Sequence, residues 1–257
     1  MLAEERFNKI LAIVELKGSV TVQQLMSILD TSESTIRRDL NTMHSNGLLI
    51  KVHGGAISKN ISGITNNKKV FDKQSLNTEE KIVIAKYAAQ LIENSDFVYL
   101  DAGTTTELLV DFLETPGATF VTNSSVIAKK LSSKGYLVYI LGGEYKAEND
   151  IIVGEEAVVT LDKYNFTKGF WGADGVSVSS GYTTTEIKIA MVKKKSMEKC
   201  KNRYVLADSS KFSQICSVKF SDFDQAKIIT TELNNEKLSK ISNVIDINNI
   251  INVDNSK

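Results

Sequence analysis

Helical and extended segments alternate along the sequence from residue 77 onward. Apolar residues at helical spacing are interleaved with short apolar runs that are typical of strands. Alternation of this kind predicts a parallel β-sheet covered by helices. We therefore expect an α/β fold in the C-terminal part of the chain, with helices at 79–92, 106–113 and 126–131 and strands at 97–100, 120–122, 137–141 and 204–206.

The first 57 residues instead predict three short helices followed by a hairpin. Thr21 and Gln24 form a capping-box arrangement at the start of the second helix, and Ser32 is a suitable N-cap for the third. Residues 48–53 predict a strand, and the glycine pair that follows predicts a tight turn. Together these elements predict a winged helix-turn-helix. The positions expected to face its core are Phe7, Ile10, Leu11, Val14, Leu25, Ile28, Leu29, Ile36, Leu40 and Met43.

The outward face of the third predicted helix is polar and rich in hydrogen-bond donors. The major groove of DNA admits an α-helix whose first residues touch base edges, while Arg and Lys contact phosphates. We expect Ser34, Thr35 and Arg38 to contact base edges. The other candidates for DNA contact are Ser32 at the start of the helix and Arg37, Lys51 and His53 at phosphates or the minor groove. A protein-docking module with a solvated polar face is the alternative reading.

Bulk composition restricts where a nucleic acid could bind. The formal net charge is zero, so DNA binding depends on local placement of Lys and Arg and not on a basic field over the whole chain. Residues 58–69 are polar and lack apolar periodicity, which predicts a connector. We expect a DNA-binding domain at 1–57, a linker at 58–74 and a second domain at 75–257.

The residue composition also argues against a metal site, Cys/His catalysis and a membrane location. Two cysteines without paired spacing and two histidines are too few for a zinc cluster, so we expect no metal, no cofactor and no Cys/His catalysis. The sequence starts without a signal-peptide pattern and contains no apolar run long enough to cross a membrane. These features predict a cytoplasmic protein with no membrane partner.

Small polar residues follow several of the predicted strands. In a parallel sheet the carboxyl ends of the strands meet at one rim, where ligands bind, and glycines and hydroxyls at helix starts suit an anion such as phosphate. Taken one at a time, these segments also fit ordinary helix caps. The lysine-rich stretch at 188–201 predicts a helix with Ile187, Ala190 and Met191 inward and the lysines solvated. The candidate ligand residues are Asp101, Gly103, Thr104, Thr105, Thr106, Asn123, Ser124, Gly143, Asp174, Lys193, Asp208 and Lys211.

Two sets of segments resemble the DeoR family of transcriptional regulators. Residues 32–40, 47–49 and 52–56 are similar to its DNA-binding signature. Its sensor domain is resembled by residues 100–106, 122–124, 142–143, 164–168 and 208–212. The resemblance implies a homo-oligomeric repressor, dimer or tetramer, that binds operator DNA and is released by a sugar phosphate. It also implies a sensor fold related to ribose-5-phosphate isomerase.

The implied ligand is a phosphorylated sugar. Residues 101–103 and 164–168 look most like regulators of fructose operons, which favours fructose 1-phosphate, with tagatose 6-phosphate next. An isomerase-like enzyme with a regulatory head is the alternative, because Asp101, Asp174 and Asp208 could act as acids or bases. Residues 192–195 hold no acid where the isomerases carry a catalytic glutamate. The chain also departs from the family after Thr185, where Lys188 and Ile189 replace an acidic pair.

Overall fold

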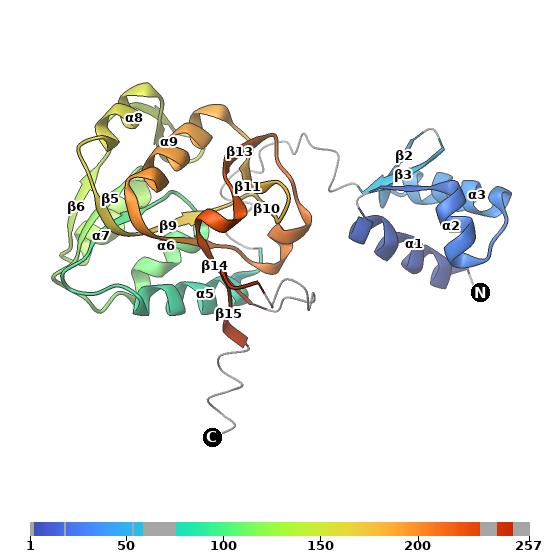
Figure 1. The fold of residues 1–257 in the computed structure, drawn as a ribbon, viewed down its shortest axis with the longest axis horizontal. Helices are drawn as coiled ribbons and strands as arrows, with labels where there is room; N and C mark the ends of the chain where they lie inside the picture. Colours follow the sequence, from blue (N-terminus) through green and yellow to red (C-terminus); the bar gives the residue numbers. More distant parts are fainter. Residues whose placement is uncertain (1–2, 18, 53, 59–75, 232–240, 249–257) are drawn as a thin grey trace, which may run out of the picture. The chain divides into compact units, whose positions relative to one another are not determined.

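The structure is a computed structural model that describes residues 3–17, 19–52, 54–58, 76–231 and 241–248 (Figure 1). It divides into two compact units, with the main boundary between Thr65 and Asn66. This boundary falls within the predicted linker, most of which lies outside the described residues. The first unit is a winged helix-turn-helix and the second is an α/β domain, as predicted.

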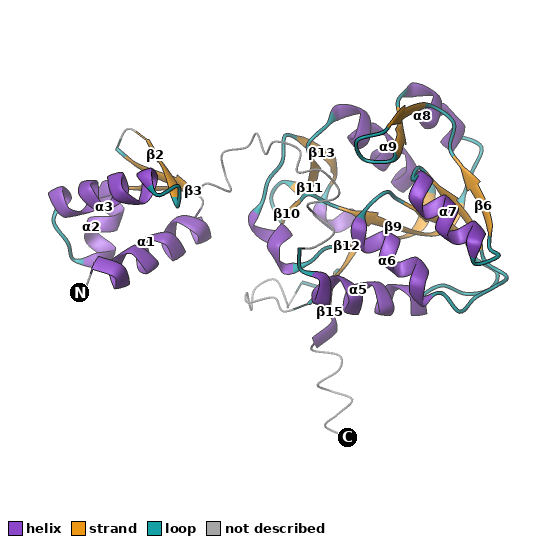
Figure 2. Cartoon of the chain, turned by 180° about the vertical axis from the view of Figure 1, so that it is seen from behind, coloured by secondary structure: helices purple, strands orange, loops and turns teal. Residues whose placement is uncertain are grey.

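The N-terminal unit contains three helices and a three-stranded antiparallel sheet (Figure 2). Its sheet has the order β1-β3-β2, and the sequence did not predict β1. Gly55 is required where β3 meets β1, since a Cβ there would lie 2.2 Å from the carbonyl oxygen of Val20. The elements are α1 (Ala3–Lys17), β1 (Ser19–Thr21), α2 (Val22–Leu29), α3 (Glu33–Ser45), β2 (Leu49–Val52) and β3 (Gly55–Ser58).

Local signals at the helix starts are partly confirmed. The capping box is present, with Gln24 N–H donating to Thr21 Oγ1 at 3.1 Å and Thr21 N–H donating to Gln24 Oε1 at 3.0 Å. Ser32 is the N-cap of α3, but its hydroxyl makes no cap hydrogen bond. Instead it contacts the hydroxyls of Ser34 and Thr35 at 3.2 and 3.0 Å. Ile28 was expected to face the core and is exposed, so that assignment was wrong.

The α/β unit is built on a parallel sheet, which confirms the fold predicted from alternation (Figures 1 and 2). The predicted helix at 106–113 begins earlier, at Thr104, and continues as a short 3-10 turn. Helices are α5 (Thr78–Gln90), α6 (Thr104–Leu109), α7 (Ser125–Ser133), α8 (Glu155–Leu161) and α9 (Ile187–Glu198). Strands are β4 (Phe97–Leu100), β5 (Thr119–Thr122), β6 (Leu137–Ile140), β7 (Glu144–Lys146), β8 (Ile151–Val153), β9 (Phe166–Gly172), β10 (Gly175–Ser177), β11 (Gly181–Thr184), β12 (Cys200–Leu206), β13 (Val218–Ser221), β14 (Lys227–Thr230) and β15 (Val244–Asp246).

Strand order determines where a ligand can enter this sheet. The seven strands lie in the order β15-β14-β12-β9-β4-β5-β6, and all of their pairings are parallel. The chain runs from β4 outward to β6, then returns to the other side of β4 and continues from β9 to β15. The direction of winding therefore reverses between β4 and β9. Such a switch point leaves a crevice at the carboxyl ends of the strands.

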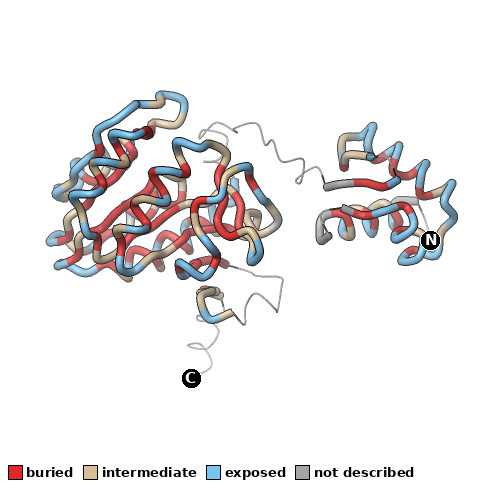
Figure 3. The backbone as a smooth tube through the Cα atoms, turned by 45° about the horizontal axis from the view of Figure 1, so that its top comes forward, coloured by how far each residue is buried: buried red, intermediate tan, exposed pale blue. Residues whose placement is uncertain are grey.

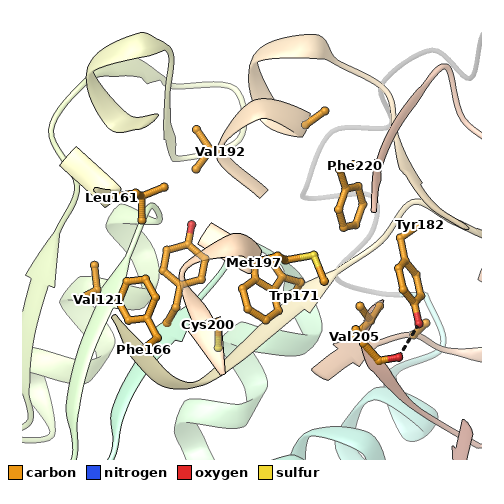
Figure 4. Close-up of a cluster of buried hydrophobic side chains, with 14 of the residues drawn as sticks. Val121, Leu161, Phe166, Trp171, Tyr182, Val192, Met197, Cys200, Val205 and Phe220 are labelled. Carbon is orange, nitrogen blue, oxygen red and sulfur yellow. Dashed lines mark hydrogen bonds between the residues drawn. The ribbon is translucent and has the colours of Figure 1, made fainter. Parts of the chain in front are cut away.

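Each face of the sheet buries its own apolar cluster. Figure 3 shows buried segments running through the interior of the α/β unit. One cluster includes Ile84 of α5, Leu109 of α6 and Ile127 of α7. The other includes Leu161 of α8 and, from the sheet, Trp171 (Figure 4). The indole Nε1 of Trp171 donates to Ser196 Oγ of α9 at 2.9 Å, which fixes this helix against the sheet.

Helix α9 does not present the face that its sequence predicted. Ile187 is 68% exposed and Met191 is also exposed, so their inward assignment was wrong. Ala190 is buried as expected. Lys193, which the solvated-face interpretation placed outside, is buried together with Val192. A buried lysine is tolerated at this position because its ammonium pairs with Asp101.

Candidate functional site

The outer face of α3 carries the predicted DNA-contacting side chains. Ser32, Ser34, Arg37 and Arg38 are exposed, whereas Thr35 and, in β2, Lys51 are half-buried. His53 lies outside the described residues. The exposed face is held in place by the buried positions Ile36, Leu40 and Met43, which pack into the core of the unit.

Three consecutive residues of α3 differ in their side-chain contacts. Arg37 pairs with Glu33 one turn earlier, at 2.7 Å on the exposed surface. Asp39 points inward and accepts a hydrogen bond from Arg6 Nη2 of α1 at 3.2 Å, as part of a buried ion pair. Within the described part of the chain, the Arg38 guanidinium has no hydrogen bond or ion pair, and it is exposed. Arg38 is therefore available to a ligand from outside, while Asp39 anchors the helix that carries it.

A cavity of about 160 Å³ opens at the carboxyl ends of the central strands of the α/β unit. Asp101 follows β4, Asn123 follows β5, Gly172 ends β9 and Asp208 follows β12, and all four line the cavity. Its position coincides with the switch point between β4 and β9. The ligand rim predicted from the strand ends is thus one continuous cavity.

The predicted ligand residues separate into two groups. Thr106 does not line the cavity, because its buried hydroxyl donates to the carbonyl oxygen of Asp101 at 2.7 Å and closes the loop before α6. Gly143 also lies outside the lining, at a φ of +143° where a Cβ would lie 2.7 Å from Val153 O. Both are structural positions. The other predicted residues all line the cavity, namely Asp101, Gly103, Thr104, Thr105, Asn123, Ser124, Asp174, Lys193, Asp208 and Lys211.

A buried ion pair forms the floor of the cavity. The Lys193 ammonium donates to Asp101 Oδ2, and also to the carbonyl oxygen of Gly172 at 2.9 Å. Gly172 N–H donates to Asp101 Oδ2 at 3.3 Å. Burial raises the pKa of Asp101 above its usual value, more than the neighbouring Lys193 lowers it. The pair joins α9 to the ends of β4 and β9, so Lys193 is already engaged by the protein.

A second predicted lysine, Lys211, also lines the cavity. Lys211 Nζ lies 3.8 Å from Asp208 Oδ2, a longer separation than a direct hydrogen bond. Asp208 is held by other donors, namely Asn77 Nδ2 at 2.8 Å and Ser210 N–H at 3.1 Å. Burial opposes ionisation of Asp208, but Lys211 and these hydrogen bonds together lower its pKa. Lys211 therefore keeps hydrogen-bonding capacity toward the cavity.

Some polar side chains at the rim also make hydrogen bonds within the protein. Ser124 caps α7 by accepting from Ile127 N–H at 3.3 Å, as the helix-cap interpretation expected. Asn123 Oδ1 accepts from Ala102 N–H at 2.9 Å and so links the ends of β4 and β5. Asp174 Oδ2 accepts from the Thr184 hydroxyl at 2.8 Å. These contacts fix the geometry of the rim before any ligand binds.

Sequence reasoning missed Lys81 of α5, which is 3% exposed and lines the cavity. A usable signal was present, since Lys81 precedes Ile84, Ala85 and Ala88 at i+3, i+4 and i+7 and so occupies the apolar stripe of its helix. The wall contributed by residues 149–151, before and within β8, was also missed. It comes from a hairpin outside the main sheet, and strand-end reasoning does not reach it.

No three His, Cys, Asp or Glu side chains among the described residues are placed to hold a metal ion. None of the described helices is both long and apolar enough to cross a bilayer.

Two family models match the chain. The DeoR-like helix-turn-helix domain matches residues 6–62, and the DeoR C terminal sensor domain matches residues 76–233. The chain is 40% identical over 233 residues to the uncharacterized HTH-type transcriptional regulator FruR of Bacillus subtilis, covering 90% of this chain and 92% of that protein. It is 31% identical over 253 residues to the lactose phosphotransferase system repressor of Streptococcus mutans, covering 97% and 100% of the two chains.

Among solved structures, the chain is similar to ribose 5-phosphate isomerase A of Methanocaldococcus jannaschii, with 18% identity and a TM-score of 0.41 over 53% of this chain and 55% of that one. These two relatives are named as a transcriptional regulator and a repressor, which favours a regulator over the isomerase alternative. Both units match models of one family over most of the chain. The chain belongs to the DeoR family of transcriptional regulators.

Proposed function

We propose that this chain is a cytoplasmic repressor of a sugar-utilisation operon that releases its operator when a phosphorylated sugar occupies the cavity of the α/β unit. The observation that carries the proposal is the cavity at the switch point, lined by lysines, hydroxyls and carboxylates, in a chain that also carries a helix-turn-helix. The names of two relatives, FruR and a lactose phosphotransferase system repressor, support a role in sugar metabolism. Fructose 1-phosphate is the favoured ligand, followed by tagatose 6-phosphate.

The charges of the cavity suggest how such a ligand would lie. Lys193 is neutralised by Asp101, whereas Lys211 faces the cavity with only a long contact to Asp208. Lys211 and the hydroxyls of Thr104 and Thr105 therefore form the expected phosphate end. The carboxylate of Asp174, on the same lining, can accept hydrogen bonds from sugar hydroxyls.

Operator binding would use α3 and the wing. Arg38 is the exposed guanidinium whose hydrogen bonds are unused in the described residues, and a bidentate contact with guanine would satisfy it. Arg37 and Lys51 would contact phosphates. The proposed domains are a DNA-binding domain at 1–57, a linker at 58–74 and a sensor at 75–257. Ligand binding would favour one sensor conformation, with a coupling of about 1–3 kcal/mol to the DNA-binding state.

The proposed ligand site is tested with Lys211→Ala. We expect this variant to bind operator DNA with normal affinity in a gel shift but to stay bound at sugar-phosphate concentrations that release the wild type. Lys219→Ala is the matched control, because Lys219 is an exposed lysine of β13 that pairs with Asp222 outside the cavity. Normal induction of Lys211→Ala by every sugar phosphate in the panel would refute the site.

The proposed DNA contact is tested with Arg38→Ala. Loss of a bidentate base contact costs about 1–3 kcal/mol, so operator affinity should fall by a factor of roughly 5 to 150. Arg37→Ala should weaken binding to all sequences alike, and Lys9→Ala on α1, whose lysine is exposed and pairs with Glu5, should have little effect. Unchanged operator affinity in a folded Arg38→Ala protein would show that α3 is not the reading helix.

A further inference from the structure

The first turn of α5 is hydrogen-bonded to the loop that follows β12. The Glu80 carboxylate accepts from the Ser209 N–H at 2.8 Å and from the Ser209 hydroxyl at 2.9 Å. Asn77, the N-cap of α5, donates from its side-chain amide to Asp208 Oδ1 at 2.8 Å. The two contacts join residues that are 129 and 131 apart in the sequence. They fix the start of a helix to the carboxyl end of a strand of the main sheet.

The same loop carries the lysine assigned to the phosphate. Asp208 and Lys211 line the cavity, and the Lys211 N–H donates to the carbonyl oxygen of Asp208 at 3.1 Å, which makes the loop a tight turn. Neither Glu80 nor Ser209 lines the cavity. Glu80 can therefore act on a ligand only through the loop. A ligand that draws Lys211 toward the cavity would shift a loop that Glu80 holds.

Helix α5 is also the first helix after the predicted linker. It begins at Thr78, directly after the connector expected at 58–74 that follows the helix-turn-helix. The body of the helix is held by Ile84, Ala85 and Ala88, which are buried in an apolar cluster. Residues 77–79 are exposed, and this first turn contacts the loop through polar groups. The contacts of the first turn can thus change while the body of α5 stays packed.

We propose that Glu80 couples the ligand site to the DNA-binding unit. By holding the 208–211 loop on the first turn of α5, it passes a shift of that loop to the helix that follows the linker. Hydrogen bonds to a carboxylate are stronger than those between neutral groups, so the loop and the turn should move together. The inference rests on the proposed function, because it requires a sugar phosphate in the cavity and DNA on the helix-turn-helix. Glu80 is a positioning residue and does not contact the ligand.

Gel shifts with the full-length protein test the coupling. The operator dissociation constant is measured without ligand and with saturating fructose 1-phosphate or tagatose 6-phosphate, with saturation established by calorimetry for each variant. A coupling of 1–3 kcal/mol makes the ratio of the two constants about 5–150 in the wild type. Glu80→Ala should lower this ratio at least about threefold. Its operator affinity without ligand should stay within about twofold of wild type.

Three further variants separate this role from a general effect of substitution. Glu79→Ala is the matched control, because Glu79 is an exposed glutamate in the same first turn, and it should keep the wild-type ratio. Thr231→Val removes a hydrogen bond to Glu80 of 2.9 Å that does not involve the loop, and it should also keep the ratio. Glu80→Gln retains an oxygen that can accept from the Ser209 N–H, so it should keep more of the ratio than Glu80→Ala.

Hydrogen–deuterium exchange gives a readout that a purely structural role would not change. Sugar phosphate should alter exchange in residues 208–211 and in residues 77–81 of the wild type, but only in residues 208–211 of Glu80→Ala. Without ligand or DNA, Glu80→Ala should speed exchange of the Ser209 amide, and Glu79→Ala should not. Unchanged Trp171 fluorescence would show that each variant is folded.

The outcomes distinguish this inference from the proposed function. A Glu80→Ala protein that keeps the wild-type ratio at saturating ligand overturns the coupling role and leaves the proposed function intact. A Glu80→Ala protein that no longer binds sugar phosphate also overturns it, because Glu80 would then serve ligand binding itself. A wild type that neither sugar phosphate releases from the operator overturns the proposed function, and the coupling with it.

Discussion

Removing the ammonium of Lys193 should destabilise the α/β unit strongly. Lys193→Met keeps the length and apolar stem of the side chain but leaves the Asp101 carboxylate buried without its cationic partner. Asp101 is 1% exposed and Lys193 is 6% exposed, so solvent cannot replace the lost interaction. Breaking one side of a buried ion pair costs about 3–5 kcal/mol, which is a large fraction of the stability of a typical domain.

The loss should depend on pH in a defined direction. Burial already raises the pKa of Asp101 in the folded wild type, and removal of Lys193 should raise it further. A carboxyl group whose pKa is higher in the folded than in the unfolded chain binds its proton more tightly in the folded state. The stability lost in Lys193→Met is therefore greatest at a pH above the pKa of Asp101 in the folded protein. This loss shrinks as the pH falls below that pKa, toward the pKa of about 3.9 that Asp101 has in the unfolded chain.

Urea unfolding followed by Trp171 fluorescence measures the stability of the α/β unit, which contains Lys193. Trp171 is the only tryptophan of the chain, is fully buried, and bonds to Ser196 one turn from Lys193. Lys195→Met is the matched control on the same helix. Lys195 pairs at 2.7 Å with Asp162, whose side chain is 54% exposed, so solvent screens this pair and its loss should cost far less stability than the loss of Lys193.

Two results would refute this reasoning. One is a Lys193→Met protein that loses no more stability than Lys195→Met at pH 7.5. The other is a deficit that does not diminish as the pH is lowered. The double variant Asp101→Asn with Lys193→Met should recover part of the loss, because no uncompensated charge then remains in the site.

Two further predictions concern buried groups elsewhere in the chain. Asp39→Ala leaves Arg6 buried without its carboxylate, so operator affinity in a gel shift should fall steeply. Trp171 fluorescence and urea unfolding of the α/β unit should stay unchanged. Retained operator affinity would show that the ion pair does not support α3. Burial raises the pKa of Cys200 to about 12, so the thiol is almost entirely protonated at pH 8. Cys200 should therefore resist iodoacetamide until the protein is unfolded in urea. Rapid alkylation of Cys200 in the folded protein, detected by peptide mass spectrometry, would contradict its burial.

The sequence predicted the class of both units because the relevant signals are local. Helical spacing, the capping box at Thr21 and the alternation of helices and strands each depend on residues close together in the chain. Position at a strand end was enough to find Asp101, Asn123 and Asp208, since parallel strands bring their carboxyl ends to one rim. This part of the cavity follows from topology, and topology follows from the pattern.

Only the tertiary structure decided which charges meet. Lys193 and Asp101 are 92 residues apart in sequence, and their contact requires α9 to pack with Ile187 outward, contrary to the phase its sequence suggested. The burial of Lys81 likewise depends on the packing of α5 beside the cavity. Periodicity specifies which face of an element is apolar, but the identity of the neighbour depends on long-range packing that no local pattern encodes.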